Sequence, residues 1–359
     1  MKVAQVCSGY YPHIGGVPTV VKQMSEGLVR KGFEVEVLAQ NPQGKYPATE
    51  IINNVTVRRF KTGPLGWDSP FSRDSLRSFL NSNSDKYDLI HAHGYHSFSP
   101  LYAARAKGSN KLVFNPHYHG TGHNLPMTFL LRLYRHIGKI TFEKADRIIC
   151  VSESEKSTVQ KHFVVPDDKI TVIPNGVDYE RIAQAIPFSL DGRVLLCVSR
   201  LEKFKNIHLA IGAVPYLPTE YQLIIIGSGP YKQRLLQLVE HLHLADRMQI
   251  LSGLSDEEVH RWYKTCDLVL NLSSQEAFGL TVLEALAAGK PVMVNNKMAL
   301  AELATKLVGV YSVDAASLPP EQLADAIAQI CSSMFAKPDL DEYRWDSIVE
   351  RITALYQSL

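Results

Sequence analysis

The chain has 359 residues, of which 45% are hydrophobic and 21% are charged. This length is typical of two domains and is sufficient to bury large cores. The 38 basic and 36 acidic residues leave a formal net charge of +2 with no long run of one sign, which excludes general coating of nucleic acid. Any anion-binding site must therefore be local.

The five cysteines are scattered, form no CxxC pair and lie mostly in apolar runs, such as Cys150 in RIICVS and Cys197 in VLLCVS. This pattern favours reduced core residues in a cytoplasmic protein. The start MKVAQVCSGYYP is too short an apolar run for a secretory signal, and no apolar stretch reaches the roughly 18 residues that a spanning helix needs. We expect a cytoplasmic protein, which can still touch the inner face of a membrane.

The first half of the chain alternates strands and helices. Residues 1–16 indicate a strand that runs into a glycine loop, and apolar residues then recur at helical spacing from Val17 to Leu28, before Gly32. Further strands are indicated by FEVEVLAQ (33–40), YDLIHAH (87–93), KLVFNPH (111–117) and DRIICVS (146–152). Because the connections are long enough for parallel crossovers, we predict a parallel sheet with covering helices over residues 1–175.

A second series of the same kind follows. Its strands are indicated by GRVLLCVSR (192–200), YQLIIIGSG (221–229), RMQILSG (247–253) and CDLVLNLS (266–273). The pattern predicts a second doubly wound domain over residues 186–339 and a closing helix within 340–359. Open parallel sheets bind ligands beyond the carboxyl ends of their strands, so we expect a site in a cleft between two facing domains.

The stretch QEAFGLTVLEALAAGKPV (275–292) places Glu276 in a loop and Glu284 inside a helix that ends at Gly289. Backbone N–H groups around Phe278, Gly279 and Leu280 would form an anion site at the helix start. A carboxylate beside bound phosphate makes sense if ligand hydroxyl groups donate to it, which indicates a sugar phosphate or a nucleotide. The alternative is that Glu276 caps the helix and Glu284 is solvated.

Basic residues and glycines follow other strands of the second half. Arg200, Lys203 and Lys205 come after VLLCVS and suit a diphosphate, although a solvated basic loop is the alternative. Gly227 and Gly229 would let the main chain approach a ligand, although an ordinary turn is at least as common.

In the first half, Gly15 and Gly16 precede a helix and either approach a ligand or form a tight turn. Histidines gather after two strands, in HAHGYHS (91–97) and PHYHGTGH (116–123). Neither cluster contains Asp or Glu, which disfavours a metal site. Hydrogen bonding to a polar ligand is the favoured interpretation, and core or loop structure is the alternative. The DLD of residues 339–341 is better explained by helix capping than by metal binding.

Residues 126–144 combine apolar and basic side chains: Phe129, Leu130, Leu133, Ile137 and Ile140 with Arg132, Arg135, Lys139 and Lys144. Such a segment either rests an amphipathic face on anionic lipid or packs its apolar residues into the core and leaves its basic side in solvent. The second interpretation is the more common for a helix of this kind.

Taken together, PHIGGVPTVV, HAH, PHYHG, VSE, PNGVD, SRLEKFKN, LIIIGSGP and EAFGLTVLEALAAGKPV resemble glycosyltransferase family four in order and spacing, over nearly the whole chain. The resemblance implies an α/β chain of the GT-B fold, with two Rossmann-like domains facing across a cleft and a C-terminal helix that returns to the first domain. It also implies retaining, nucleotide-sugar-dependent glycosyl transfer.

Residue roles carry over by the same resemblance. Glu284 is similar to the residue that binds the ribose, and Glu276 to the one that contacts donor-sugar hydroxyls, with the backbone from Ala277 to Leu280 holding phosphate or sugar. The remaining roles fall to Arg200 and Lys205 at the diphosphate, His117 beside the donor sugar, and Gly15 and Gly16 near diphosphate and acceptor. The catalytic set would be His117, Glu276, Arg200 and Lys205, with no metal and no cofactor. NNKMALAEL departs from the usual glycine-containing segment, which leaves the role of Glu302 open.

The leading hypothesis is a hexosyltransferase that uses a UDP- or GDP-sugar and a sugar or lipid-linked acceptor, in glycan or glycolipid synthesis. A nucleotide-sugar epimerase of GT-B architecture and a catalytically silent nucleotide-sugar-binding protein are the alternatives.

Overall fold

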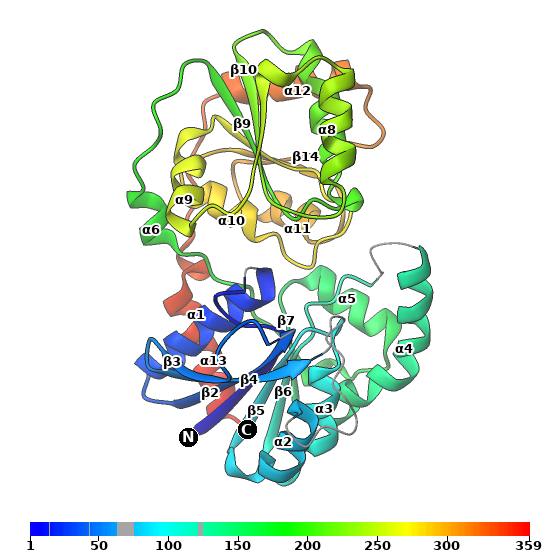
Figure 1. The fold of residues 1–359 in the computed structure, drawn as a ribbon, viewed down its shortest axis with the longest axis vertical. Coiled ribbons are helices and arrows are strands. Elements are labelled where there is room, and N and C mark those ends of the chain that lie inside the picture. Colours follow the sequence, from blue (N-terminus) through cyan, green and yellow to red (C-terminus); the bar gives the residue numbers. More distant parts are fainter. Residues whose placement is uncertain (14, 43, 63–74, 121–124) are drawn as a thin grey trace. The chain divides into compact units, whose positions relative to one another are not determined.

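The computed structural model of the chain describes residues 1–13, 15–42, 44–62, 75–120 and 125–359 (Figure 1). It divides into two compact units. Unit 1 comprises Met1–Gly176 with Trp345–Leu359, and unit 2 comprises Val177–Arg344. Each unit is one sheet covered by helices on both faces.

The sheet of unit 1 has the strand order β3-β4-β2-β1-β5-β6-β7-β8, in which every neighbouring pair is parallel except β3 with β4. The chain extends the sheet one way from β1 and then returns to β5 on the other side, so the strand order reverses between β1 and β5. The strands are β1 Lys2–Cys7, β2 Glu34–Pro42, β3 Thr49–Ile52, β4 Val55–Thr62, β5 Leu89–His93, β6 Lys111–Asn115, β7 Arg147–Cys150 and β8 Ile170–Val172.

Helices cover both faces of this sheet. Side chains of α2 to α5 share a core with one face, which includes Ile90 and Ala92 of β5. The other face meets α1 and α13, which pack so closely that a Cβ atom on Gly27 of α1 would lie 2.4 Å from Val349 of α13. The helices are α1 Gly16–Arg30, α2 Leu76–Asn83, α3 Ser99–Ala106, α4 Leu125–Lys144, α5 Glu153–His162 and α13 Trp345–Gln357.

The sheet of unit 2 is parallel throughout, with the order β11-β10-β9-β12-β13-β14. Its order reverses between β9 and β12, so the loops after these two strands leave the same edge side by side. The strands are β9 Arg193–Val198, β10 Tyr221–Ile226, β11 Met248–Leu251, β12 Leu268–Asn271, β13 Val292–Asn295 and β14 Val310–Val313. The helices are α6 Tyr179–Gln184, α7 Ile207–Ala213, α8 Lys232–His241, α9 Asp256–Thr265, α10 Leu280–Ala287, α11 Met298–Lys306 and α12 Pro320–Ser332.

The predicted fold class, two Rossmann-like α/β units, is confirmed. Unit 2 begins earlier than residue 186 because α6 packs on α9 and α10. It extends to Arg344, since the N–H of Val177 donates to the carbonyl of Tyr343 (2.8 Å). Along the described stretches, no helix has both the length and the apolar character needed to span a bilayer.

Candidate functional site

Two loops of unit 2 are joined at the reversal point of its sheet. Asn206, which follows β9 with a left-handed backbone (φ 55°), donates from its side chain to the carbonyl of Leu272 after β12 (2.9 Å). The N–H of Ser274 donates back to the carbonyl of Phe204 (2.9 Å). These bonds fix the basic loop after β9 against the loop that leads into α10.

The joined loops bring Lys205 and Glu276 into an ion pair. Both side chains are largely covered, with exposed fractions of 14% and 21%. Two residues that the sequence assigned to different parts of one ligand therefore meet directly in this structure. Arg200 lies on the same loop but is more exposed, and its guanidinium pairs with Glu202 (2.6 Å).

The amino end of α10 follows Glu276. Gly279 caps it with a left-handed backbone (φ 103°), and a Cβ atom there would lie 2.9 Å from a methyl group of Leu300. The first turn of α10 contains no acidic residue. Ala277 is half-buried and the Phe278 ring is buried, so the segment Ala277–Leu280 can present only its backbone N–H groups and the positive end of the helix dipole to an anion.

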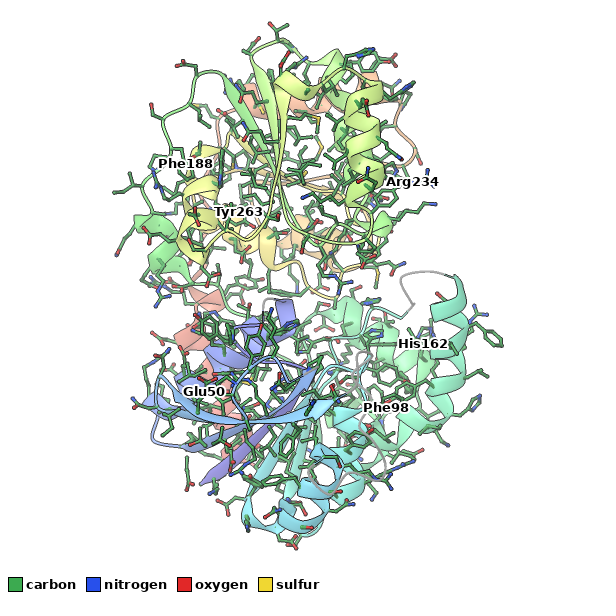
Figure 2. The ribbon with its side chains drawn as sticks, in the orientation of Figure 1. Glu50, Phe98, His162, Phe188, Arg234 and Tyr263 are labelled. Atoms are coloured by element: carbon green, nitrogen blue, oxygen red, sulfur yellow. The ribbon has the colours of Figure 1, made fainter. Side chains whose placement is uncertain are left out.

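Glu284 lies one turn further along α10. Tyr263, labelled in Figure 2, is a fully buried residue of α9. Its hydroxyl donates to the Oε2 atom of Glu284 (2.6 Å). Burial raises the pKa of Glu284, and the Tyr263 hydrogen bond opposes that rise. One carboxylate oxygen is thus fixed inside the unit, which orients the carboxylate.

Gly227 and Gly229 follow β10 where the backbone passes close to the loop after β9. A Cβ atom on Gly227 would lie 1.9 Å from the carbonyl oxygen of Ser199, and one on Gly229 would lie 2.4 Å from that of Leu201. The fold itself therefore requires glycine at both positions. The predicted donor contact at Gly227 stays a prediction beside this structural reason.

Gly16 presents the opposite case. It begins α1, after the first strand of unit 1, and a Cβ atom on it would meet no described heavy atom within 4 Å. Gly15 precedes it in extended backbone (φ 165°) as the cap of α1, and a Cβ atom there would lie 3.4 Å from Pro18. The space beside Gly16 is consistent with the predicted backbone approach of a ligand, which stays a prediction.

His117 follows β6 in the left-handed region (φ 47°), which is uncommon for a residue with a side chain. Burial lowers its pKa to about 4, so the imidazole is neutral near pH 7. Its Nε2 atom is buried and has no hydrogen-bond partner among the described residues. Its ring stacks on that of His93, with 6.0 Å between the ring centroids. A neutral imidazole with an unused nitrogen can exchange a hydrogen bond with a ligand, which is consistent with the predicted role.

A buried carboxylate holds the residue that follows His117. Glu155 of α5 is completely buried and accepts the N–H of Tyr118, as well as the N–H of Val151 (2.6 Å). No cation bonds to it among the described residues, and burial raises its pKa to about 8. Glu155 therefore fixes the backbone just after the strained residue through an acceptor that titrates near neutral pH.

The favoured interpretation of the HAHGYHS histidines is wrong for His91 and His93. Both are completely buried on β5, where His91 bonds to the hydroxyl of Tyr356 and His93 to the side chain of Gln5, each at 2.6 Å. Because these residues face α13, they are core residues rather than ligand contacts. His96 is exposed and stacks on His119, and His123 lies outside the described residues.

The described residues contain no group of three or more His, Cys, Asp or Glu side chains that could hold a metal ion. In the DLD stretch, a carboxylate oxygen of Asp339 accepts the N–H of Asp341 (2.9 Å) at the start of a short helical turn. The cap residue of that turn, Leu340, makes no side-chain bond, and the last helix begins only at Trp345, so the expected capping of the last helix by this stretch is wrong.

Sequence reasoning missed Tyr263, Asn206 and Glu155. Tyr263 lies in an amphipathic helix, where the pattern predicts only that a tyrosine packs in the core. Asn206 gave no pattern beyond its place in the basic loop. Glu155 did give a signal, because Ser152-x-x-Glu155 is the pattern of a capping box. Ser152 accepts the N–H of Glu155 as that pattern predicts (3.0 Å), but the Glu155 carboxylate binds Val151 and Tyr118 instead of closing the box.

Two α/β units with mainly parallel sheets in one chain, with cationic and carboxylate side chains beyond the strand ends of unit 2, are the architecture of the GT-B fold. The family models agree: residues 14–181 match Glycosyltransferase Family 4 and residues 178–351 match Glycosyl transferases group 1. The chain belongs to glycosyltransferase family four.

The similarity to known relatives and to solved structures covers at least 99% of this chain. The chain is 28% identical to an uncharacterized glycosyltransferase of Methanocaldococcus jannaschii, over 99% of this chain and 98% of that protein. It is 24% identical to one component of human phosphatidylinositol N-acetylglucosaminyltransferase, over 99% of this chain and 75% of that protein. The structure of Anabaena HepE in complex with UDP-glucose shares its fold, with a TM-score of 0.79, 19% identity and full coverage of both chains.

Proposed function

We propose that the protein is a retaining, metal-independent glycosyltransferase that moves a hexose from a UDP- or GDP-sugar to a sugar or lipid-linked acceptor, in glycan or glycolipid synthesis. The observation that carries the proposal is the Lys205–Glu276 pair at the reversal point of the unit 2 sheet, beside the amino end of α10. A cation, a carboxylate and the amino end of a helix at one place suit a ligand with a diphosphate and neighbouring hydroxyl groups.

We assign the ribose of the donor to Glu284. Tyr263 donates to Oε2, so Oε1 is the atom that we expect to accept the ribose hydroxyls. Glu276 would accept hydroxyls of the donor sugar, and in doing so it would release Lys205 to the diphosphate. The ion pair thus holds both side chains in place until the donor supplies each with a better-matched partner.

The reaction breaks the bond between the anomeric carbon and the diphosphate oxygen, and the electron pair of that bond leaves with the diphosphate. Lys205, Arg200 and the N–H groups of residues 277–280 would stabilise the negative charge that grows there. The acceptor oxygen forms the new bond on the face that the leaving group vacates, and its proton passes to the departing phosphate. Neutral His117 would hydrogen-bond the donor sugar rather than transfer a proton.

Cationic side chains and backbone amides supply the charge stabilisation in this scheme, which is why we propose that no divalent metal is needed. All five cysteines are free thiols, which fits the reducing cytoplasm that we propose as the site of the reaction. The human relative acts, by its name, on phosphatidylinositol. That name supports a lipid-linked acceptor as one of the two acceptor classes.

The test is incubation of the protein with UDP-, GDP- and ADP-sugars, with and without candidate acceptors and EDTA, followed by measurement of released nucleotide and of products. We expect acceptor-dependent release that survives EDTA and a product with the anomeric configuration of the donor. Interconversion of free nucleotide sugars would identify an epimerase instead. Donor binding without turnover would identify a silent binding protein, and loss of activity in EDTA would contradict metal independence.

A single variant tests the ribose assignment. Glu284→Ala should weaken donor binding by roughly tenfold or more, because two hydroxyl contacts to a charged acceptor are lost. The matched control is Glu240→Ala on the exposed face of α8 in the same unit. Wild-type donor affinity in Glu284→Ala would refute the assignment.

A further inference from the structure

The helix α4 of unit 1 exposes an apolar stripe to solvent. Phe129, Leu133 and Ile137 follow one another at intervals of four residues, and Leu130 flanks them. Their exposed fractions are 62%, 53%, 46% and 56% in that order. Because residues four apart lie on one side of a helix, these side chains form one continuous surface, which we call the α4 stripe.

The opposite side of α4 is the one that packs on unit 1. Leu131 and Phe142 are buried in the core, and a Cβ atom on Gly138 would lie 2.6 Å from the hydroxyl oxygen of Tyr95. This close approach fixes which side of the helix faces inward. The segment thus has apolar residues on both sides, and the α4 stripe, expected from the sequence to face the core, is the side in solvent.

Basic groups border the α4 stripe. Arg132 and Lys139 are exposed next to it, although Lys139 also pairs with Glu143 (3.5 Å). At the carboxyl end of the helix, a solvent-open hollow of about 620 Å³ includes Lys144 in its lining. Its other basic lining residues are Lys107, Lys111, Arg147 and Lys169.

The hollow, which we call the basic hollow, carries more positive than negative side chains. Its acidic lining residues are Glu143 and Asp146, and Asp146 pairs with Lys107 (2.7 Å). Lys169 donates to the carbonyls of Glu143 and Ala145, both at 3.2 Å. These hydrogen bonds satisfy donors of Lys169 without neutralising its charge, so the surface keeps a net positive potential at the end of the α4 stripe.

We propose that the α4 stripe and the basic hollow dock unit 1 on a membrane surface rich in anionic lipid. Apolar side chains in a row, next to cations, match the boundary between acyl chains and negatively charged headgroups. A second copy of this chain fits less well, because a twofold interface through the α4 stripe would bring the two sets of basic residues toward each other. The proposal does not depend on the reaction, since attachment can be measured without any donor.

The experiment is co-sedimentation of the full chain with vesicles of phosphatidylcholine, and with vesicles in which about half of the lipid is phosphatidylglycerol. We expect binding to the anionic vesicles only, weakened when NaCl rises from about 0.1 M to about 0.5 M. Absence of binding to the anionic vesicles would overturn the proposal.

Two variants separate the apolar and the electrostatic parts. Leu133→Gln with Ile137→Gln should reduce the partition onto anionic vesicles by roughly tenfold, because less apolar surface enters the lipid. Lys111→Gln with Arg147→Gln should reduce it several-fold and flatten the salt dependence. The matched control is Val164→Gln, which changes an exposed apolar side chain of unit 1 outside α4. Wild-type partition in either double variant, or an equal loss in the control, would contradict the proposal.

Two further measurements distinguish other occupants. Sedimentation velocity without vesicles should show the same oligomeric state for the wild type and for Leu133→Gln with Ile137→Gln. A dimer that this variant dissociates would identify the α4 stripe as a contact between copies instead. Inorganic phosphate should displace the protein from vesicles no better than chloride at equal ionic strength, and a specific displacement would identify the basic hollow as a site for a free anion.

Discussion

Replacement of Glu155 by glutamine should reverse the order of stability of wild type and variant between acid and alkaline pH. The folded-state pKa of Glu155 is raised to about 8 from an ordinary value of 4.5. Protonation therefore favours the folded state, so the stability that this group contributes is complete below pH 4.5 and is lost as pH rises toward 8. Over the whole range the contribution of Glu155 to the free energy of unfolding decreases by about 5 kcal/mol, and about 4 kcal/mol of this loss occurs between pH 5 and pH 8.5.

Glutamine cannot ionise, but it has one acceptor oxygen where the carboxyl group has two. Either the N–H of Tyr118 or that of Val151 would then face an amide NH₂ group, at a cost of about 1–3 kcal/mol at any pH. We therefore expect Glu155→Gln to be less stable than wild type near pH 5 by this amount. Near pH 8.5 it should be more stable by roughly the same amount, because the wild type alone carries a buried charge there.

The assay is urea unfolding of both proteins near pH 5 and near pH 8.5, followed by circular dichroism. Other titrating groups cancel in the difference between the two proteins. Glu153→Gln, on the exposed side of the same helix, is the control and should change little at either pH. A deficit of the variant that stays constant or grows with pH would refute the reasoning, since it would show that Glu155 is ionised throughout.

Three further predictions concern unit 2 and the glycines. Gly16→Ala should leave the melting temperature unchanged or slightly raised but lower donor turnover, whereas Gly227→Ala should lose about 2 kcal/mol or more of stability through the clash with Ser199. Thermal melts and a turnover assay distinguish the two variants. Equal melting temperatures for the two variants would contradict the predicted difference in stability. Tyr263→Phe should raise the pKa of Glu284 further and weaken donor binding several-fold, most strongly at acid pH. Titration calorimetry across pH measures this affinity, and a donor affinity of the variant that does not change with pH would contradict the prediction. Lys205→Met should lower kcat by roughly a hundredfold with partial recovery in Lys205→Arg, and a change confined to KM would argue against a role in leaving-group departure.

Much of the fold followed from short apolar runs. Largely buried parallel strands such as LIHAH (89–93) and RVLLCV (193–198) are bounded by turns, and the segments between them have helical spacing. The meeting of Lys205 and Glu276 had a basis in the same pattern, because the loops after β9 and β12 leave one edge of a parallel sheet.

Other features depend on packing that sequence does not encode locally. The sequence of α4 has apolar residues on two sides, and only the approach of Gly138 to Tyr95 decides which side is buried. The burial of His91 and His93 depends on Tyr356, which lies more than 260 residues further along the chain. The sequence interpretation of these histidines as ligand contacts failed for that reason.

The position of α13 in unit 1 also matters for how the protein is made. Tyr356 and Val349 cover a face of the first sheet, yet about 170 residues of unit 2 must be synthesised before them. At about 5–20 residues per second, the nascent first sheet waits roughly 10–30 s with His91, Gln5 and the Gly27 side of α1 uncovered. During that time an incomplete apolar face is available to chaperones or to another nascent chain. Chains that stop before α13 would never cover this face, so a truncation that removes this helix alone should yield an aggregation-prone product.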